Sequence, residues 1–99
     1  MPINITYIFT ASVWQHPSPG GWYFVSLPNE LSQEIREHFG WQEEGWGRLK
    51  GKAKVFKSFW DTAIWYDTKQ ETYILPLKAE IRKKEKIEIG NILDVEIII

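Results

Sequence analysis

Residues 48–55 alternate strictly between cationic side chains and apolar or small ones, and this pattern restricts the fold more than any other feature of the sequence. The cations are Arg48, Lys50, Lys52 and Lys54, and the residues between them are Leu49, Gly51, Ala53 and Val55. Successive side chains of a β-strand point to opposite faces, whereas a helix would mix the two sets. The segment is therefore predicted to be a strand with a basic outer face and an inner face toward a core.

A second alternation, over residues 3–13, predicts another half-buried strand. Its apolar parity consists of Ile3, Ile5, Tyr7, Phe9, Ala11 and Val13. Residues 22–27, 59–66, 72–75 and 92–99 are rich in β-branched and aromatic side chains and are predicted to be further strands. The fold class is therefore predicted to be mostly β.

A helix is predicted after Pro28, because Leu31, Ile35 and Phe39 recur every four residues. Asn29 is expected to be its N-cap, and Gly40 its left-handed C-cap.

The order of strand, Leu-Pro and helix occurs twice, over residues 25–36 and 74–82. The second helix is expected to carry Leu77 and Ile81. Two such units suggest a pseudo-symmetric β-barrel whose two short helices cap its ends.

The size and composition favour one globular domain over residues 1–99, since 43% of the residues are hydrophobic and 15% are aromatic. The absence of cysteine excludes disulfides, thiolate nucleophiles and cysteine-ligated zinc, and it fits a reducing compartment. No apolar run approaches the roughly 18 residues that span a bilayer, and no signal peptide is recognisable. We therefore expect a cytoplasmic protein without a membrane anchor.

The charges are unevenly distributed, although the net charge is only −1. Residues 1–45 hold one arginine and five glutamates, whereas residues 46–99 hold eleven lysines and arginines and eight acids. This asymmetry could favour head-to-tail association between copies or an anionic partner, although at this magnitude an ordinary solvated surface is the commoner explanation. We expect a monomer or a homodimer.

Five short segments follow one another along the chain: residues 23–28 (YFVSLP), 45–47 (GWG), 60–62 (WDT), 73–79 (YILPLKA) with Arg82-Lys83, and 89–91 (IGN). In order and spacing they resemble the DUF1905 family, a domain of unknown function, over roughly residues 5–98. The LPLKA segment with Arg82 is the most specific part of the resemblance.

The resemblance implies a small closed β-barrel of the double-split type, similar to AbrB-like transition-state regulators but completed within one chain. It implies no known activity. The family often has Thr-Ser where this chain has Thr62-Ala63, and Gly-Asp where it has Gly90-Asn91. A role for that hydroxyl or carboxylate does not carry over directly to this chain.

Lys78 and Arg82 lie four residues apart, and so on one side of the second predicted helix. Two cations there could hold a carboxylate or phosphate. The alternative is that they cap backbone carbonyls or pair with neighbouring acids such as Glu80 and Glu85.

Trp60 and Thr62 share a parity that points into the predicted barrel, and Trp46 or Trp22 could complete a small cavity with them. The alternative is that these rings only fill the core. With Lys78 and Arg82 they form the first hypothesis, a non-enzymatic binding module for a small anionic or polar ligand or for a protein segment.

The second hypothesis is nucleic-acid binding by the basic face of Arg48, Lys50, Lys52 and Lys54, which is extended by Lys57 and flanked by aromatic residues. A pI of about 6.1 opposes it, and a solvated strand face explains the same residues.

The third hypothesis is an enzyme. It ranks last because His16 and His38 are far apart and because no nucleophile, metal-ligand spacing or cofactor motif is recognisable. No catalytic residue, metal or cofactor is predicted.

Overall fold

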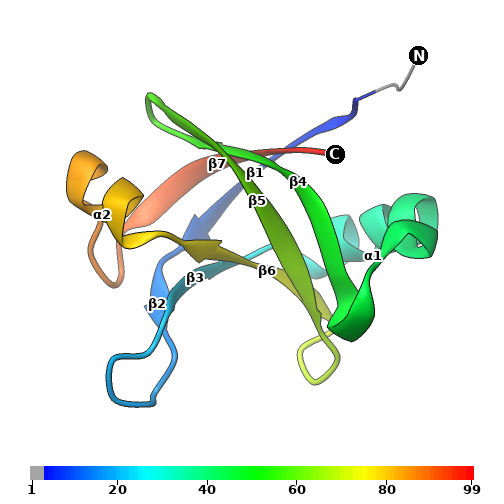
Figure 1. Ribbon diagram of the computed structural model, residues 1–99, viewed down its shortest axis with the longest axis horizontal. Helices are drawn as coiled ribbons and strands as arrows, with labels where there is room; N and C mark the ends of the chain where they lie inside the picture. The colour runs from blue at the N-terminus through cyan, green and yellow to red at the C-terminus, as the bar shows by residue number, and fades with distance from the viewer. Residues whose placement is uncertain (1–3) are drawn as a thin grey trace.

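The computed structural model describes residues 4–99, which form one curled antiparallel sheet with two helices and two short 3₁₀ turns (Figure 1). The strands are β1 (Thr6–Ser12), β2 (Trp14–Gln15), β3 (Tyr23–Ser26), β4 (Arg48–Val55), β5 (Ser58–Asp67), β6 (Thr72–Leu77) and β7 (Ile92–Ile98). The helices are α1 (Asn29–Phe39) and α2 (Ala79–Glu85), and the 3₁₀ turns are η1 (Gly40–Gln42) and η2 (Gly45–Gly47). The predicted mostly-β class is confirmed. Ile3, assigned above to the first strand, lies outside the described residues.

The sheet is a curled half-barrel, and the prediction of a closed double-split barrel is wrong for the described residues. The strand order is β1-β7-β4-β5-β6-β3-β2, with β1 and β2 at the two edges. The chain passes from one edge to the other at Val13, whose backbone bonds to Gly90 and Asn91. Beyond this bend only Trp14 and Gln15 pair with β3. Two residues are too few to join the edges into a continuous ladder.

β4 has the predicted alternation. Leu49, Ala53 and Val55 are buried, whereas the cations between them lie on the outer face. The β4–β5 hairpin places Leu49 opposite Ile64 and Ala53 opposite Trp60, so the inner faces of both strands contribute to the core.

The core fills the concave face of the sheet, and the helices add Ile35 from α1 and Ile81 from α2. Figure 1 shows α1 and α2 at opposite ends of the curled sheet, as expected for capping helices. None of the helices in residues 4–99 is long and apolar enough to cross a membrane.

Both predicted caps of α1 are wrong. Asn29 is the first residue of the helix, and its Nδ2 donates to the carbonyl oxygens of Gln70 and Glu71 in the β5–β6 turn. Gly40 has a right-handed φ of −54° because the chain continues directly into η1. The polar residue at this end therefore ties the helix to the sheet instead of capping it.

β6 extends two residues beyond its predicted end, through Pro76 and Leu77. Leu77, assigned above to the second helix, pairs with Tyr23 of β3 and is buried in the core. Proline tolerates extended backbone, so the Leu-Pro sequence does not end the strand.

Candidate functional site

β5 and β6 separate within the sheet, and this separation forms the candidate site. β6 pairs with β5 only through residues 72–74. The backbone of Tyr73 points away from β5, since its carbonyl accepts the N–H of Leu27 and its N–H donates to Ser32 Oγ. Backbone directions alternate along a strand, so the nitrogen of Pro76 faces β5, where it has no N–H to donate. The ladder therefore ends before Pro76.

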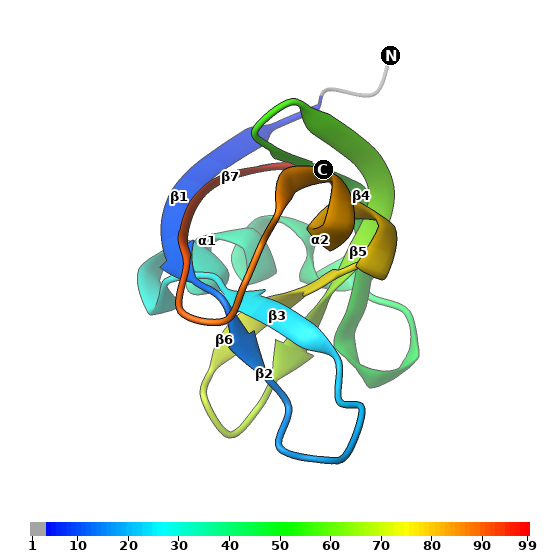
Figure 2. The same ribbon diagram turned by 90° about the vertical axis from the view of Figure 1, so that its left-hand side faces the viewer.

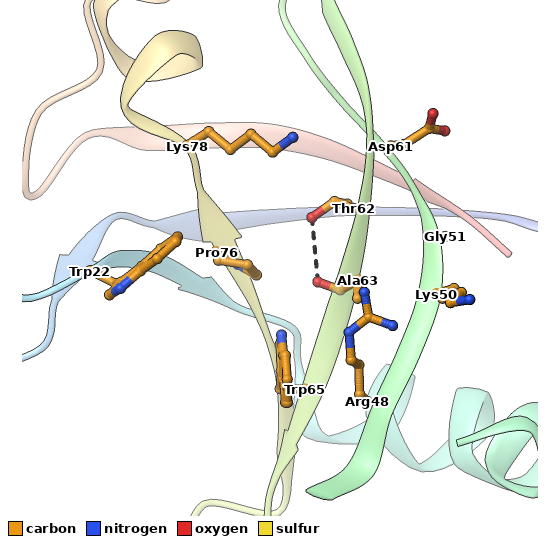
Figure 3. A pocket seen from close by; sticks show the side chains of 10 residues that line it. All are labelled: Trp22, Arg48, Lys50, Gly51, Asp61, Thr62, Ala63, Trp65, Pro76 and Lys78. Atoms are coloured by element: carbon orange, nitrogen blue, oxygen red, sulfur yellow. Dashed lines mark hydrogen bonds between the residues drawn. The ribbon is translucent and has the colours of Figure 1, made fainter. Parts of the chain in front are cut away.

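A groove of about 500 Å³ opens beside this separation (Figure 3). We call it the β5/β6 groove, and its lining includes Trp22, Arg48, Lys50, Thr62, Trp65, Pro76 and Lys78. In Figure 3 Lys78 extends from the end of β6 toward β5, and the Thr62 side chain points into the groove. An apolar hollow of about 370 Å³ adjoins it, shares Trp22, Trp65 and Pro76, and adds Phe24 and Ile74.

The groove carries three cations and one carboxylate, that of Asp61. Two of the cations are already paired, because Arg48 Nη1 lies 2.8 Å and Lys50 Nζ 3.8 Å from Glu44 Oε1. Lys78 has no carboxylate within salt-bridge distance among residues 4–99. Lys78 is therefore the cation whose charge is available to a ligand.

Two tryptophans give the groove a flat apolar surface. Trp22 is 63% exposed and Trp65 is 36% exposed. The guanidinium carbon of Arg48 lies 5.8 Å from the ring centroid of Trp65, within the range of a cation–π contact. Cationic and aromatic surfaces therefore meet along one groove.

Of the five residues predicted to bind a ligand, the structure brings only Lys78 and Thr62 together in this groove. Arg82 lies over the ring of Tyr23, 3.8 Å from its centroid, and its Nε donates to the carbonyl oxygen of Leu77. Trp60 is 8% exposed and belongs to the core. Trp46 is 92% exposed and lines a separate hollow with Arg36, Glu43 and Tyr66.

The four cations predicted to bind nucleic acid share the outer face of β4, but they have different partners. Arg48 and Lys50 line the β5/β6 groove. Lys52 Nζ lies 5.6 Å from the ring centroid of Phe59, and Lys54 Nζ lies 3.7 Å from a carboxylate oxygen of Glu96. A carboxylate therefore lies within salt-bridge distance of Arg48, Lys50 and Lys54, whereas the partner of Lys52 is an aromatic ring.

Trp65 and Pro76 line the groove but were not predicted to be site residues. Trp65 lies opposite Arg48 because the hairpin turns at Phe56 and Lys57. The sequence did not mark this turn, since Phe-Lys is not a typical turn-forming pair. The proline inside an apolar strand was the signal for an interrupted ladder.

Thr62 supplies the hydroxyl group of the groove. The hydroxyl of Thr62 makes only a long 3.5 Å bond to the carbonyl oxygen of Ala63, which cannot act as a base. Within residues 4–99 no three His, Cys, Asp or Glu side chains gather into a metal site.

The family model described as Domain of unknown function (DUF1905) matches residues 9–97, nearly the whole chain. No curated protein is significantly similar to the chain.

Proposed function

This chain belongs to the DUF1905 family of domains of unknown function, and we propose that it is a non-enzymatic module that binds a small anionic ligand with a flat apolar group in the β5/β6 groove. The observation that carries the proposal is the meeting of an unpaired cation, Lys78, with the exposed rings of Trp22 and Trp65 along one groove.

The anionic part of the ligand is assigned to the end of the groove beside Lys78 and Thr62. An ammonium group without a carboxylate partner gains a charge-assisted hydrogen bond when a phosphate or carboxylate enters, and such bonds contribute about 1.5–3 kcal/mol. The Thr62 hydroxyl supplies a neutral donor beside it. Arg48 and Lys50 share the one carboxylate of Glu44, so the pair still contributes a net positive charge to the groove.

The flat part of the ligand is assigned to the apolar hollow beside Trp22 and Trp65. Stacking of a planar ring on an exposed aromatic side chain contributes about 1–3 kcal/mol. Pro76 and Ile74 extend the same apolar surface. A ligand with both parts would therefore bind more tightly than either part alone.

Calorimetric titration of the full chain with three probes separates these contributions. The probes are adenosine monophosphate, adenosine and inorganic phosphate. We expect the monophosphate to bind more tightly than either fragment. Lys78→Ala should weaken binding of the monophosphate by about tenfold, and Trp22→Ala should do the same, which corresponds to about 1.4 kcal/mol each.

Lys83→Ala and Trp41→Ala are the matched controls, because both residues are exposed and lie outside the groove. They should leave the affinity unchanged. Equal losses in the controls, or equal affinity for all three probes, would contradict the proposal.

Single-stranded nucleic acid is a second candidate, favoured by the position of Arg48 beside the exposed ring of Trp65. Nucleic-acid binding predicts that oligothymidine binds at low salt. Its affinity should fall steeply as salt is added, since phosphate contacts release counterions. An affinity that does not respond to salt, or no binding at low salt, rejects it.

A further inference from the structure

β1 is an edge strand whose backbone is unpaired on one side. Ile5 and Ile99 exchange both of their backbone hydrogen bonds, at 2.9 and 3.0 Å. Because bonding direction alternates along an antiparallel strand, Ile8 and Thr10 direct their N–H and C=O groups away from β7. Among residues 4–99 no other group bonds to the backbone of these two residues.

This edge lacks the features by which proteins usually prevent edge pairing. β1 contains no charged residue and no proline, and its pairing with β7 runs without a bulge. The side chain of Ile8 is 70% exposed. Edge strands in soluble proteins commonly carry a lysine, a proline or a bulge, and an edge without them is a template on which another strand can pair.

A groove of about 360 Å³ runs between this edge and α1. Its lining is Ile8, Phe9, Pro28, Glu30, Leu31 and Glu34, without a cation. Figure 2 shows β1 at the margin of the sheet with α1 next to it.

Glu30 and Glu34 project from one side of α1, since they are four residues apart. Burial is the main cause that raises the pKa of Tyr7 in β1, and the negative charge of the Glu34 carboxylate is the second. This second cause is consistent with a short distance between α1 and the strand. An uncharged strand edge therefore lies beside two carboxylates.

We propose that the groove between β1 and α1 binds an extended polypeptide segment of another protein, which adds to β1 as a further strand and places basic side chains opposite Glu30 and Glu34. Main-chain bonds to Ile8 and Thr10 would hold the segment, and the carboxylates would select its charge. A second copy of this chain fits less well, because its own β1 has no cation to offer.

The test uses three capped seven-residue peptides titrated into the full chain. The first alternates lysine with valine, the second alternates glutamate with valine, and the third is the first with proline at its centre. We expect only the first to bind, because the second repels the carboxylates and the third cannot form the ladder.

Glu30→Lys combined with Glu34→Lys should weaken binding of the lysine peptide by about tenfold or more. Glu37→Lys is the matched control, since Glu37 is exposed on the same helix but does not line the groove. Equal loss in both variants, or equal binding of all three peptides, overturns the proposal.

Amide hydrogen exchange provides a measurement that needs no variant. The N–H groups of Ile8 and Thr10 should exchange rapidly in the free protein and become protected with the lysine peptide, whereas those of Tyr7 and Phe9 are protected in both states. Unchanged exchange at Ile8 and Thr10 with the peptide in excess overturns the proposal. Protection without peptide in a dimeric sample, measured by analytical ultracentrifugation, overturns it in favour of a second copy.

Discussion

Gly51 of β4 stands where the backbone of β7 approaches so closely that there is no room for a side chain. A Cβ atom at Gly51 would lie 2.7 Å from the carbonyl oxygen of Ile98, a backbone atom held in β7. We predict that Gly51→Ala lowers the free energy of unfolding by about 1–3 kcal/mol, because overpacking forces backbone shifts. Urea unfolding measures the change. Gly45→Ala is the control, since nothing lies within 4 Å of its added Cβ. Equal stability of the two variants would refute the close contact.

Tyr73 makes the free energy of unfolding depend on pH in the alkaline range. Burial, and then its hydrogen bond to Glu43, raise the pKa of Tyr73 above the ordinary 10.0. Above about pH 10 the unfolded chain loses this proton while the folded chain retains it, so the free energy of unfolding falls as pH rises. This contribution is fully present below about pH 10 and is lost as the pH approaches the raised pKa of the folded state.

Tyr73→Phe should therefore show a shallower fall in stability between about pH 9 and about pH 11 than the unsubstituted chain. At neutral pH the same variant should be less stable by about 1–3 kcal/mol, because Glu43 loses a hydrogen bond. Urea unfolding at each pH measures both effects. Identical slopes in the two proteins would show that the raised pKa of Tyr73 does not contribute.

At the scale of elements, α2 is fastened to the β4–β5 hairpin by one carboxylate. Glu85 Oε2 accepts hydrogen bonds from Ser58 Oγ at 2.6 Å and from the backbone N–H of Lys57 at 3.2 Å. We predict that Glu85→Ala lowers the free energy of unfolding by about 1–3 kcal/mol, since it leaves the buried Ser58 hydroxyl without its partner. Glu85→Gln should lose less, because its amide oxygen still accepts. Glu80→Ala, in the first turn of α2, is the control, and a loss as large as that of Glu85→Ala would contradict this role.

Most elements could be predicted from the sequence because alternation and four-residue spacing act locally. Both the basic outer face of β4 and the apolar stripe of α1 follow from such patterns. The caps of α1 could not be predicted, because Asn29 has carbonyl partners in a turn that is remote in sequence. The hydrogen bonds of Asn29 to this turn outweighed its local preference for the N-cap position.

The candidate site was predicted only in part, for a similar reason. Parity correctly assigns Trp60 and Thr62 to one face of β5, but it cannot show that β6 departs beside Thr62. Trp60 is therefore in the core, whereas Thr62 lines a groove. Arg82 lies over Tyr23, which depends on the pairing of β3 with β6 rather than on the spacing from Lys78.

In the molecule as a whole, the open sheet leaves room for two grooves that a closed barrel would not have. The separation of β5 from β6 gives a groove with cationic and aromatic walls, and the unpaired side of β1 gives a second groove with acidic residues. The two grooves have opposite charge, in line with the uneven distribution of charge along the chain. Occupants of opposite charge are therefore proposed for them.

The most direct measurement of the proposed function is a titration of the full chain with adenosine monophosphate, followed through the backbone and indole N–H signals by NMR. The largest shifts are predicted at the amides of Thr62 and Lys78 and at the indoles of Trp22 and Trp65. The largest shifts at Trp46, or no shift at about 10 mM ligand, a concentration that would detect even a millimolar Kd, would contradict the assignment of this groove.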